Sequence, residues 1–144
     1  MVEKLLNLQV KFPEPKIKFA MAEQLKALIV DDEKDICYLL SEILKGRNIQ
    51  VSFVNSISDA EKLLQEEHPN IIFLDNFLPD GFGIDFIDTI RSLYPEVKVI
   101  MITAHDTYTD RDKALLKGID QFVGKPFTKE TIFAALESIA LVNE

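Results

Sequence analysis

Five side chains that could bind a cation or handle a phosphoryl group stand at or just beyond the ends of apolar runs: Asp31, Asp32, Asp75, Thr103 and Lys125. Clustered carboxylates repel one another and therefore need a cation. Oxygen ligands suit a hard ion, and Mg²⁺ typically takes one or two carboxylates, keeps several waters and shares a phosphate. An aspartate can also attack phosphorus to form an acyl phosphate, whose oxygens a lysine and a hydroxyl group would stabilise. The residue types therefore favour magnesium-assisted phosphoryl chemistry.

The apolar runs that precede these side chains are typical of buried strands, and they cover residues 25–30, 49–54, 71–74, 97–102 and 121–123. Helical patterns lie between them. Apolar residues fall on one helical stripe in the first and last of these segments: Ile36, Leu39, Leu40, Ile43 and Leu44, then Ile132, Phe133, Leu136, Ile139 and Ala140. Strands without polar alternation, separated by helices, predict a parallel sheet covered on both faces. The carboxyl ends of its strands share one edge, where such sheets bind ligands, so we expect the five side chains to converge there.

Short signals predict where several helices begin or end. Two pairs have capping-box spacing, the second more weakly: Ser58 with Glu61, and Thr107 with Asp110. Gly46 and Gly118 stand just beyond helical patterns. We expect both glycines to end their helices with a positive φ.

The composition is that of an acidic globular domain. The chain has 144 residues, a length that fits one domain. Its net charge is -8, and the sequence has no basic stripe, so direct nucleic-acid binding is not expected. Cys37 is the single cysteine, so no disulfide can form within the chain and we expect a reducing compartment. Cys37 lies beside apolar positions of the first predicted helix, so we expect it to be a small core residue. No apolar run is long enough to span a bilayer, and the N-terminus lacks the apolar region of a signal peptide. We therefore expect a cytoplasmic protein without a membrane anchor.

Residues 1–23 differ from the rest of the chain. Apolar and polar residues alternate in their first half, and Pro13 and Pro15 then interrupt the pattern. We expect a poorly ordered N-terminal extension, with a hairpin, an arm on a partner or a remnant of cloning as alternatives. The predicted domain then covers residues 24–144.

Each candidate side chain also has a purely structural explanation. Asp31 or Asp32 alone could cap the next helix, and Asp75 could be an ordinary loop residue. Thr103 could simply end a strand, and Lys125 could be a solvated lysine. Their joint occurrence at successive strand ends is what favours a shared site.

Four motifs resemble those of response-regulator receiver domains of the chemotaxis-regulator type. They are Ile-Val-Asp-Asp-Glu at 29–33, Phe-Leu-Asp-Asn-Phe-Leu-Pro-Asp-Gly at 73–81, Ile-Thr-Ala at 102–104 and Phe-Val-Gly-Lys-Pro-Phe at 122–127. The resemblance spans residues 25–142. It implies a flavodoxin-like, three-layer (βα)5 fold whose parallel five-stranded sheet has the strand order 2-1-3-4-5. It also implies a phosphoacceptor of two-component signalling, which assists its own phosphorylation and dephosphorylation and is not an enzyme in its own right.

The resemblance also implies a role for individual residues. Asp75 would be the phosphoacceptor, and Thr103 and Lys125 would contact the phosphoryl group. The implied Mg²⁺ ligands are Asp31, Asp32, Asp75 and the backbone carbonyl of Phe77. Thr103 and Phe122 would form the conformational switch, and the Lys125–Pro126 peptide bond would be cis.

The partners implied by the resemblance are a sensor histidine kinase or a histidine phosphotransfer protein as phosphoryl donor, and an output domain or effector protein. A homodimer would form through the fourth helix, fifth strand and fifth helix of the repeat. Asn76 and the Phe82-Gly83 pair depart from the family's commonest pattern. The alternatives are a non-phosphorylated pseudo-receiver that acts as an interaction module, or another α/β protein such as a flavin carrier or a phosphatase.

Overall fold

Strands and helices alternate along the chain in the computed structural model, which describes residues 24–104 and 107–139. The elements in chain order are β1 (Lys26–Val30), α3 (Lys34–Lys45), β2 (Gln50–Val54), α4 (Ile57–Glu67), β3 (Ile71–Leu74), β4 (Phe77–Leu78), β5 (Gly81–Phe82), α5 (Gly83–Leu93), β6 (Lys98–Thr103), α6 (Tyr108–Leu116), β7 (Gln121–Gly124) and α7 (Lys129–Ser138). The predicted extension 1–23 and the chain end from Ala140 lie outside the described residues.

Five of these strands form one parallel sheet in the order β2-β1-β3-β6-β7. This confirms the predicted order 2-1-3-4-5 and the flavodoxin-like fold. The strand order reverses at β1, because the chain first adds β2 on one side and then β3 and β6 on the other. The carboxyl ends of β1 and β3 therefore flank the topological switch point, where open α/β sheets bind ligands.

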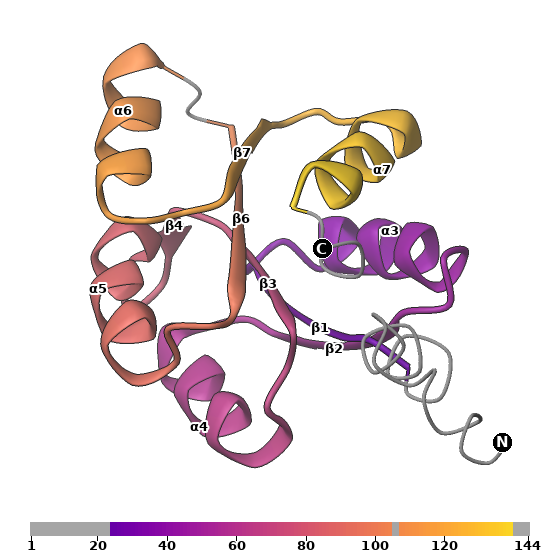
Figure 1. The fold of residues 1–144 in the computed structure, drawn as a ribbon, viewed down its shortest axis with the longest axis horizontal. Helices are drawn as coiled ribbons and strands as arrows, with labels where there is room; N and C mark the ends of the chain where they lie inside the picture. The colour runs from indigo at the N-terminus through magenta and orange to yellow at the C-terminus, as the bar shows by residue number, and fades with distance from the viewer. Residues whose placement is uncertain (1–23, 105–106, 140–144) are drawn as a thin grey trace, which may run out of the picture.

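Helices cover both faces of the sheet (Figure 1). In this view α3 and α7 lie on one side of the strands, and α4, α5 and α6 lie on the other. Successive residues of a strand point to opposite faces, so Ile29 packs in the core under α3 and α7, while Leu28 and Val30 pack in the core under the other three helices. Both cores are apolar and fully buried, which holds the strand ends in fixed positions.

The start of α4 differs from the prediction. Its N-cap is Ser56, whose hydroxyl oxygen accepts a hydrogen bond from the backbone N–H of Asp59 at 3.1 Å. The predicted capping box at Ser58 and Glu61 is therefore wrong, because Ser56 offers an equivalent cap two residues earlier and both predicted residues lie inside the helix. The weaker signal is confirmed: Thr107 caps α6 and accepts from the N–H of Asp110.

The two glycines behave differently from each other. Gly118 has a φ of 102°, as predicted. Gly46 has a φ of -63° and continues the helical conformation beyond α3, so the predicted positive φ is wrong. The left-handed residue after α3 is Asn48, with a φ of 60°, and asparagine tolerates this region better than most residues.

Cys37 is a residue of the core, as predicted from the sequence. Cys37 is fully buried on α3, where its thiol donates to the backbone carbonyl of Asp31 at 3.3 Å. Burial raises the pKa of this thiol to about 11, and the charge of Asp31 adds to the effect. Along the described residues, no helix has the length and apolar character needed to cross a membrane.

Candidate functional site

The predicted site residues lie together at the carboxyl edge of the sheet. Asp31 directly follows β1, Asp75 directly follows β3, Thr103 ends β6 and Lys125 directly follows β7. A cavity of about 260 Å³ opens at this edge. Its lining residues are Asp32, Glu33, Asp75, Phe77, Thr103, Ala104 and Lys125. The parallel sheet thus gathers residues that are far apart in the chain.

Three carboxylates form the acidic part of the site. Asp31, Asp32 and Asp75 each offer an oxygen atom within 4.8 Å of the others. Asp31 and Asp75 are almost fully buried, with 2% and 5% of their surface exposed, whereas Asp32 is exposed. A cluster of oxygen donors with buried negative charge suits a hard cation such as Mg²⁺.

Lys125 is the cation that the chain itself places in this cluster. Its Nζ lies 2.8 Å from Asp31 Oδ2, 2.7 Å from Glu33 Oε1 and 3.5 Å from Asp75 Oδ2. Burial lowers the pKa of Lys125, but hydrogen bonds to Asp31 and Glu33 and the charge of Asp75 outweigh this effect and raise the pKa overall. The ammonium group is therefore charged at any physiological pH.

Asp75 has an unusually basic carboxylate in this setting. Burial raises the pKa of Asp75 to about 6, and the charge of Asp31 contributes in the same direction. Lys125 and the backbone N–H of Asn76, which donates to Asp75 Oδ1 at 2.8 Å, oppose the shift without cancelling it. Burial also raises the pKa of Asp31, against the hydrogen bond from Lys125. A bound cation would relieve both shifts, because it would offset the negative charge that burial penalises.

The segment after Asp75 is tied to the start of α5. The backbone N–H of Gly83 donates to the carbonyl of Asn76 at 2.7 Å, and the N–H of Ile84 donates to Asn76 Oδ1 at 2.9 Å. A side chain at position 83 would overlap the backbone carbonyl of Asp75. Gly83 is therefore required for this close approach, which fixes the backbone of Asp75.

A short hairpin that the sequence analysis did not predict borders the site. Strands β4 and β5 pair in antiparallel fashion, Phe77 with Phe82 and Leu78 with Gly81. The rings of Phe77 and Phe82 meet edge to face, 5.5 Å apart, and both are partly exposed. At its turn, Asp80 accepts hydrogen bonds from the backbone N–H groups of Ile57 and Ser58. These two bonds lower the pKa of Asp80 and attach the first turn of α4 to the hairpin.

Lys125 is positioned by its backbone as well as by its charge. Its N–H donates to the carbonyl of Thr103 at 2.9 Å, and the Lys125–Pro126 bond is cis, the conformation that the resemblance implied. Phe122, the implied switch residue, lies away from the acidic cluster in the core beneath α6, with 7% of its surface exposed. The guanidinium carbon of Arg111 lies 4.9 Å from the centre of its ring.

One contact of the site was not predicted from sequence. Glu33 forms the shortest ion pair of Lys125, although only its place in the acidic run after the first strand hinted at such a role. Lys125 contacts both Asp31 and Asp75 directly, whereas Asp32, Thr103 and Phe77 complete the walls of the site.

Comparison with known proteins agrees with this geometry. Residues 27–137 match the response regulator receiver domain. The chain belongs to this family. The receiver domain is a signalling phosphoacceptor of two-component systems rather than a conventional enzyme, and its phosphorylation site is an aspartate.

Several solved structures resemble this receiver domain. A beryllofluoride-activated DrrB receiver domain is 30% identical, with a TM-score of 0.74 over 80% of this chain and 96% of that one. A two-component response regulator from Clostridium difficile is 27% identical, with a TM-score of 0.77 over 81% and 95% of the two chains. A response regulator from Burkholderia pseudomallei, solved with a phosphorylated aspartic acid and a calcium ion, is 26% identical, with a TM-score of 0.73 over 78% and 66%.

Proposed function

We propose that Asp75 accepts a phosphoryl group from a phosphohistidine of a sensor histidine kinase or histidine phosphotransfer protein. The observation that carries this proposal is the Asp75 carboxylate, buried beside two further carboxylates and 3.5 Å from the Lys125 ammonium. Two similar structures support it, one with a phosphorylated aspartic acid and the other activated by beryllofluoride.

In the proposed reaction, a carboxylate oxygen of Asp75 attacks phosphorus. A P–O bond forms while the P–N bond of the phosphohistidine breaks, and its electron pair returns to the imidazole nitrogen of the donor. Lys125 would neutralise charge on the phosphoryl oxygens, and the Thr103 hydroxyl would donate a hydrogen bond to them. The fixed backbone around Asp75 keeps the nucleophile in place during the reaction.

Mg²⁺ is the cofactor that this donor set fits best. The residues proposed to hold it are Asp31, Asp32, Asp75 and the backbone carbonyl of Phe77. When bound, the ion supplies positive charge that neutralises the carboxylates and the incoming phosphate. The chain's own part is to hold two buried carboxylates with raised pKa values and one exposed carboxylate at the same edge.

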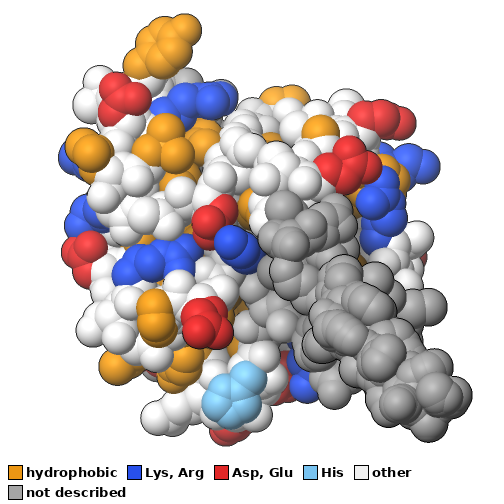
Figure 2. Space-filling view, in the orientation of Figure 1, with side chains coloured by type: hydrophobic (Ala, Val, Ile, Leu, Met, Phe, Trp, Pro, Cys, Tyr) orange, Lys and Arg blue, Asp and Glu red, His pale blue; other side chains and the backbone are white. Residues whose placement is uncertain are grey.

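Phosphorylation would act on partners through Thr103 and Phe122. We propose that the Thr103 hydroxyl turns toward the phosphoryl group and that the loop after β6 follows, which changes the packing of Phe122 beneath α6. The surface that reports this change would be α6, β7 and α7, used for an output partner or for a homodimer. Figure 2 shows hydrophobic side chains at the surface over α6, at its upper left. The exposed hydrophobic residues of this helix are Tyr108, Leu115 and Leu116. Residues 24–144 would form this receiver unit, working in the cytoplasm.

The test is intact-protein mass spectrometry after incubation with acetyl phosphate. With Mg²⁺ we expect one phosphoryl adduct on the wild-type protein, and none with EDTA or in Asp75→Asn. The exposed variant Asp85→Asn serves as the matched control and should be modified like the wild type. An unmodified wild-type protein would favour the pseudo-receiver alternative.

A further inference from the structure

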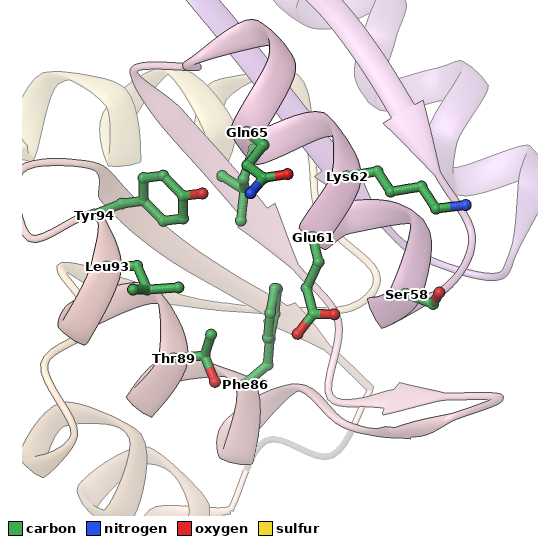
Figure 3. A pocket seen from close by; sticks show the side chains of 9 residues that line it. Ser58, Glu61, Lys62, Gln65, Phe86, Thr89, Leu93 and Tyr94 are labelled. Carbon is green, nitrogen blue, oxygen red and sulfur yellow. The ribbon is translucent and has the colours of Figure 1, made fainter.

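A second cavity lies away from the acidic site, in the groove between α4 and α5. It measures about 370 Å³, within the range of small-ligand sites, and is larger than the acidic cavity. Its lining residues are Ser58, Glu61, Lys62, Leu64, Gln65, Phe86, Thr89, Leu93 and Tyr94 (Figure 3). None of these residues lines the acidic cavity.

The floor of the groove is apolar and its walls are polar. Leu64 and Phe86 form the floor and are buried, with 1% and 4% of their surface exposed. Leu93 extends the apolar surface and is 63% exposed. On the other side of Tyr94 lies a second hollow of about 240 Å³, which Glu96 and His68 also line. The two hollows share Leu64 and Tyr94 as lining residues, so they lie next to each other.

The charge in the groove is negative. The carboxylate of Glu61 points into the cavity toward Phe86 and Thr89, whereas the ammonium group of Lys62 points away from it (Figure 3). Glu61 has no hydrogen bond or ion pair with any residue that the structure describes. A second carboxylate, Glu96, lines the neighbouring hollow. An apolar floor beside these carboxylates complements a ligand with an apolar stem and a positive head.

We propose that this groove binds a basic, amphipathic segment of a partner protein. A lysine or arginine would lay its aliphatic stem on Leu64 and Phe86 and place its charged head at Glu61. The ring of Tyr94 offers a further surface for a cation. An apolar residue next to this basic residue in the partner segment would cover Leu93. The net charge of -8 would favour the encounter of the chain with a basic partner.

The test is an NMR titration of the full-length protein with a defined probe. The probe is acetyl-Leu-Arg-Ala-Leu-Arg-amide, and its partner has glutamine in place of both arginines. We expect saturable amide shifts that cluster at the groove-lining residues of α4 and α5 with the arginine peptide and much smaller shifts with the glutamine peptide. Glu61→Gln should weaken binding about tenfold, because it removes a charge-assisted hydrogen bond.

The matched control is Glu66→Gln, which removes the same charge from an exposed residue of α4 outside the groove. It should change affinity by less than about twofold, as for a surface charge. Equal weakening by both variants would show non-specific attraction to an acidic surface and overturn the proposal. Equal binding of the two peptides, or shifts outside the groove, would overturn it as well. None of these results depends on phosphorylation of Asp75.

Discussion

The Nζ atom of Lys125 lies 3.5 Å from Oδ2 of Asp75, although the two residues follow different strands. The same nitrogen lies closer to Asp31 and Glu33, which hold the lysine beside the proposed phosphoacceptor rather than directly on it. Positive charge is thus available at Asp75 while the carboxylate still lines the open cavity.

Asp75→Asn should stabilise the metal-free protein at neutral pH. The pKa of Asp75 is about 6 in the folded protein, whereas the ordinary pKa of an aspartate is 3.8. Between these values the folded state binds more protons than the unfolded state, so stability falls as pH rises from about 4 to 6 and stays reduced above that range. The variant lacks this penalty, which is at most about 3 kcal/mol.

Urea denaturation in EDTA at several pH values measures the effect. We expect the variant to exceed wild type in unfolding free energy at pH 7.5, and the difference to disappear near pH 4. Asp85→Asn, at an exposed position of α5, should give no such gain. A wild-type protein as stable as Asp75→Asn at pH 7.5 would contradict the raised pKa.

Lys125→Met should destabilise the metal-free protein. It leaves the buried Asp31 and Asp75 carboxylates without a positive neighbour, and breaking a buried pair in this way costs about 3–5 kcal/mol. Part of the lost unfolding free energy should return in the double variant with Asp75→Asn, with a coupling energy above about 1 kcal/mol.

The control is Lys98→Met, which removes a partly exposed lysine 3.9 Å from Asp120 and should cost less than about 1 kcal/mol. Strictly additive unfolding energies for Lys125→Met and Asp75→Asn would show that the pair is not coupled.

Gly83→Ala should destabilise the protein by about 2 kcal/mol or more, because its Cβ meets the backbone of Asp75 and the backbone has to move. Gly46→Ala is the matched control, since Gly46 has an ordinary helical φ and should change stability by less than about 1 kcal/mol. Thermal unfolding of both variants in one buffer makes the comparison. Similar melting temperatures for the two would mean that the Asp75–Gly83 approach is not tight.

Thr103→Ala should uncouple the phosphoryl site from Phe122. With Mg²⁺ and beryllofluoride, a mimic of the phosphoryl group, we expect NMR shifts of the wild type around Phe122 and Arg111. The variant should still bind the mimic, seen at Asp75 and its neighbours, but show smaller shifts beneath α6. A full response of the Phe122 region in Thr103→Ala would exclude coupling through the hydroxyl.

Much of the fold was predictable because the central strands are buried on both faces. Residues 71–74 form a continuous apolar run, and β3 occupies that range. The convergence of Asp31, Asp75 and Lys125 followed from the parallel sheet, since its strands end at one edge. These features depend on patterns that are local in the sequence.

Other features could not be predicted, because they depend on contacts across the fold or on competing local signals. The β4–β5 hairpin has two residues in each strand, too few to show a periodic pattern. The pairing of Glu33 with Lys125 joins two loops that only the folded sheet brings together. The cap of α4 was misassigned because Ser56 and Ser58 offer similar signals, and the attachment of Asp80 to the first turn of α4 became visible only in the structure.

Chemical mapping of the phosphorylated residue tests the central claim most directly. Borohydride reduces an aspartyl phosphate to homoserine, so peptide mass spectrometry after treatment with acetyl phosphate, Mg²⁺ and borohydride locates the modified position. We predict homoserine at position 75 and unmodified aspartate at positions 31 and 32. Homoserine at position 31 or 32, or an adduct that persists in Asp75→Asn, would contradict the assignment of Asp75 as phosphoacceptor.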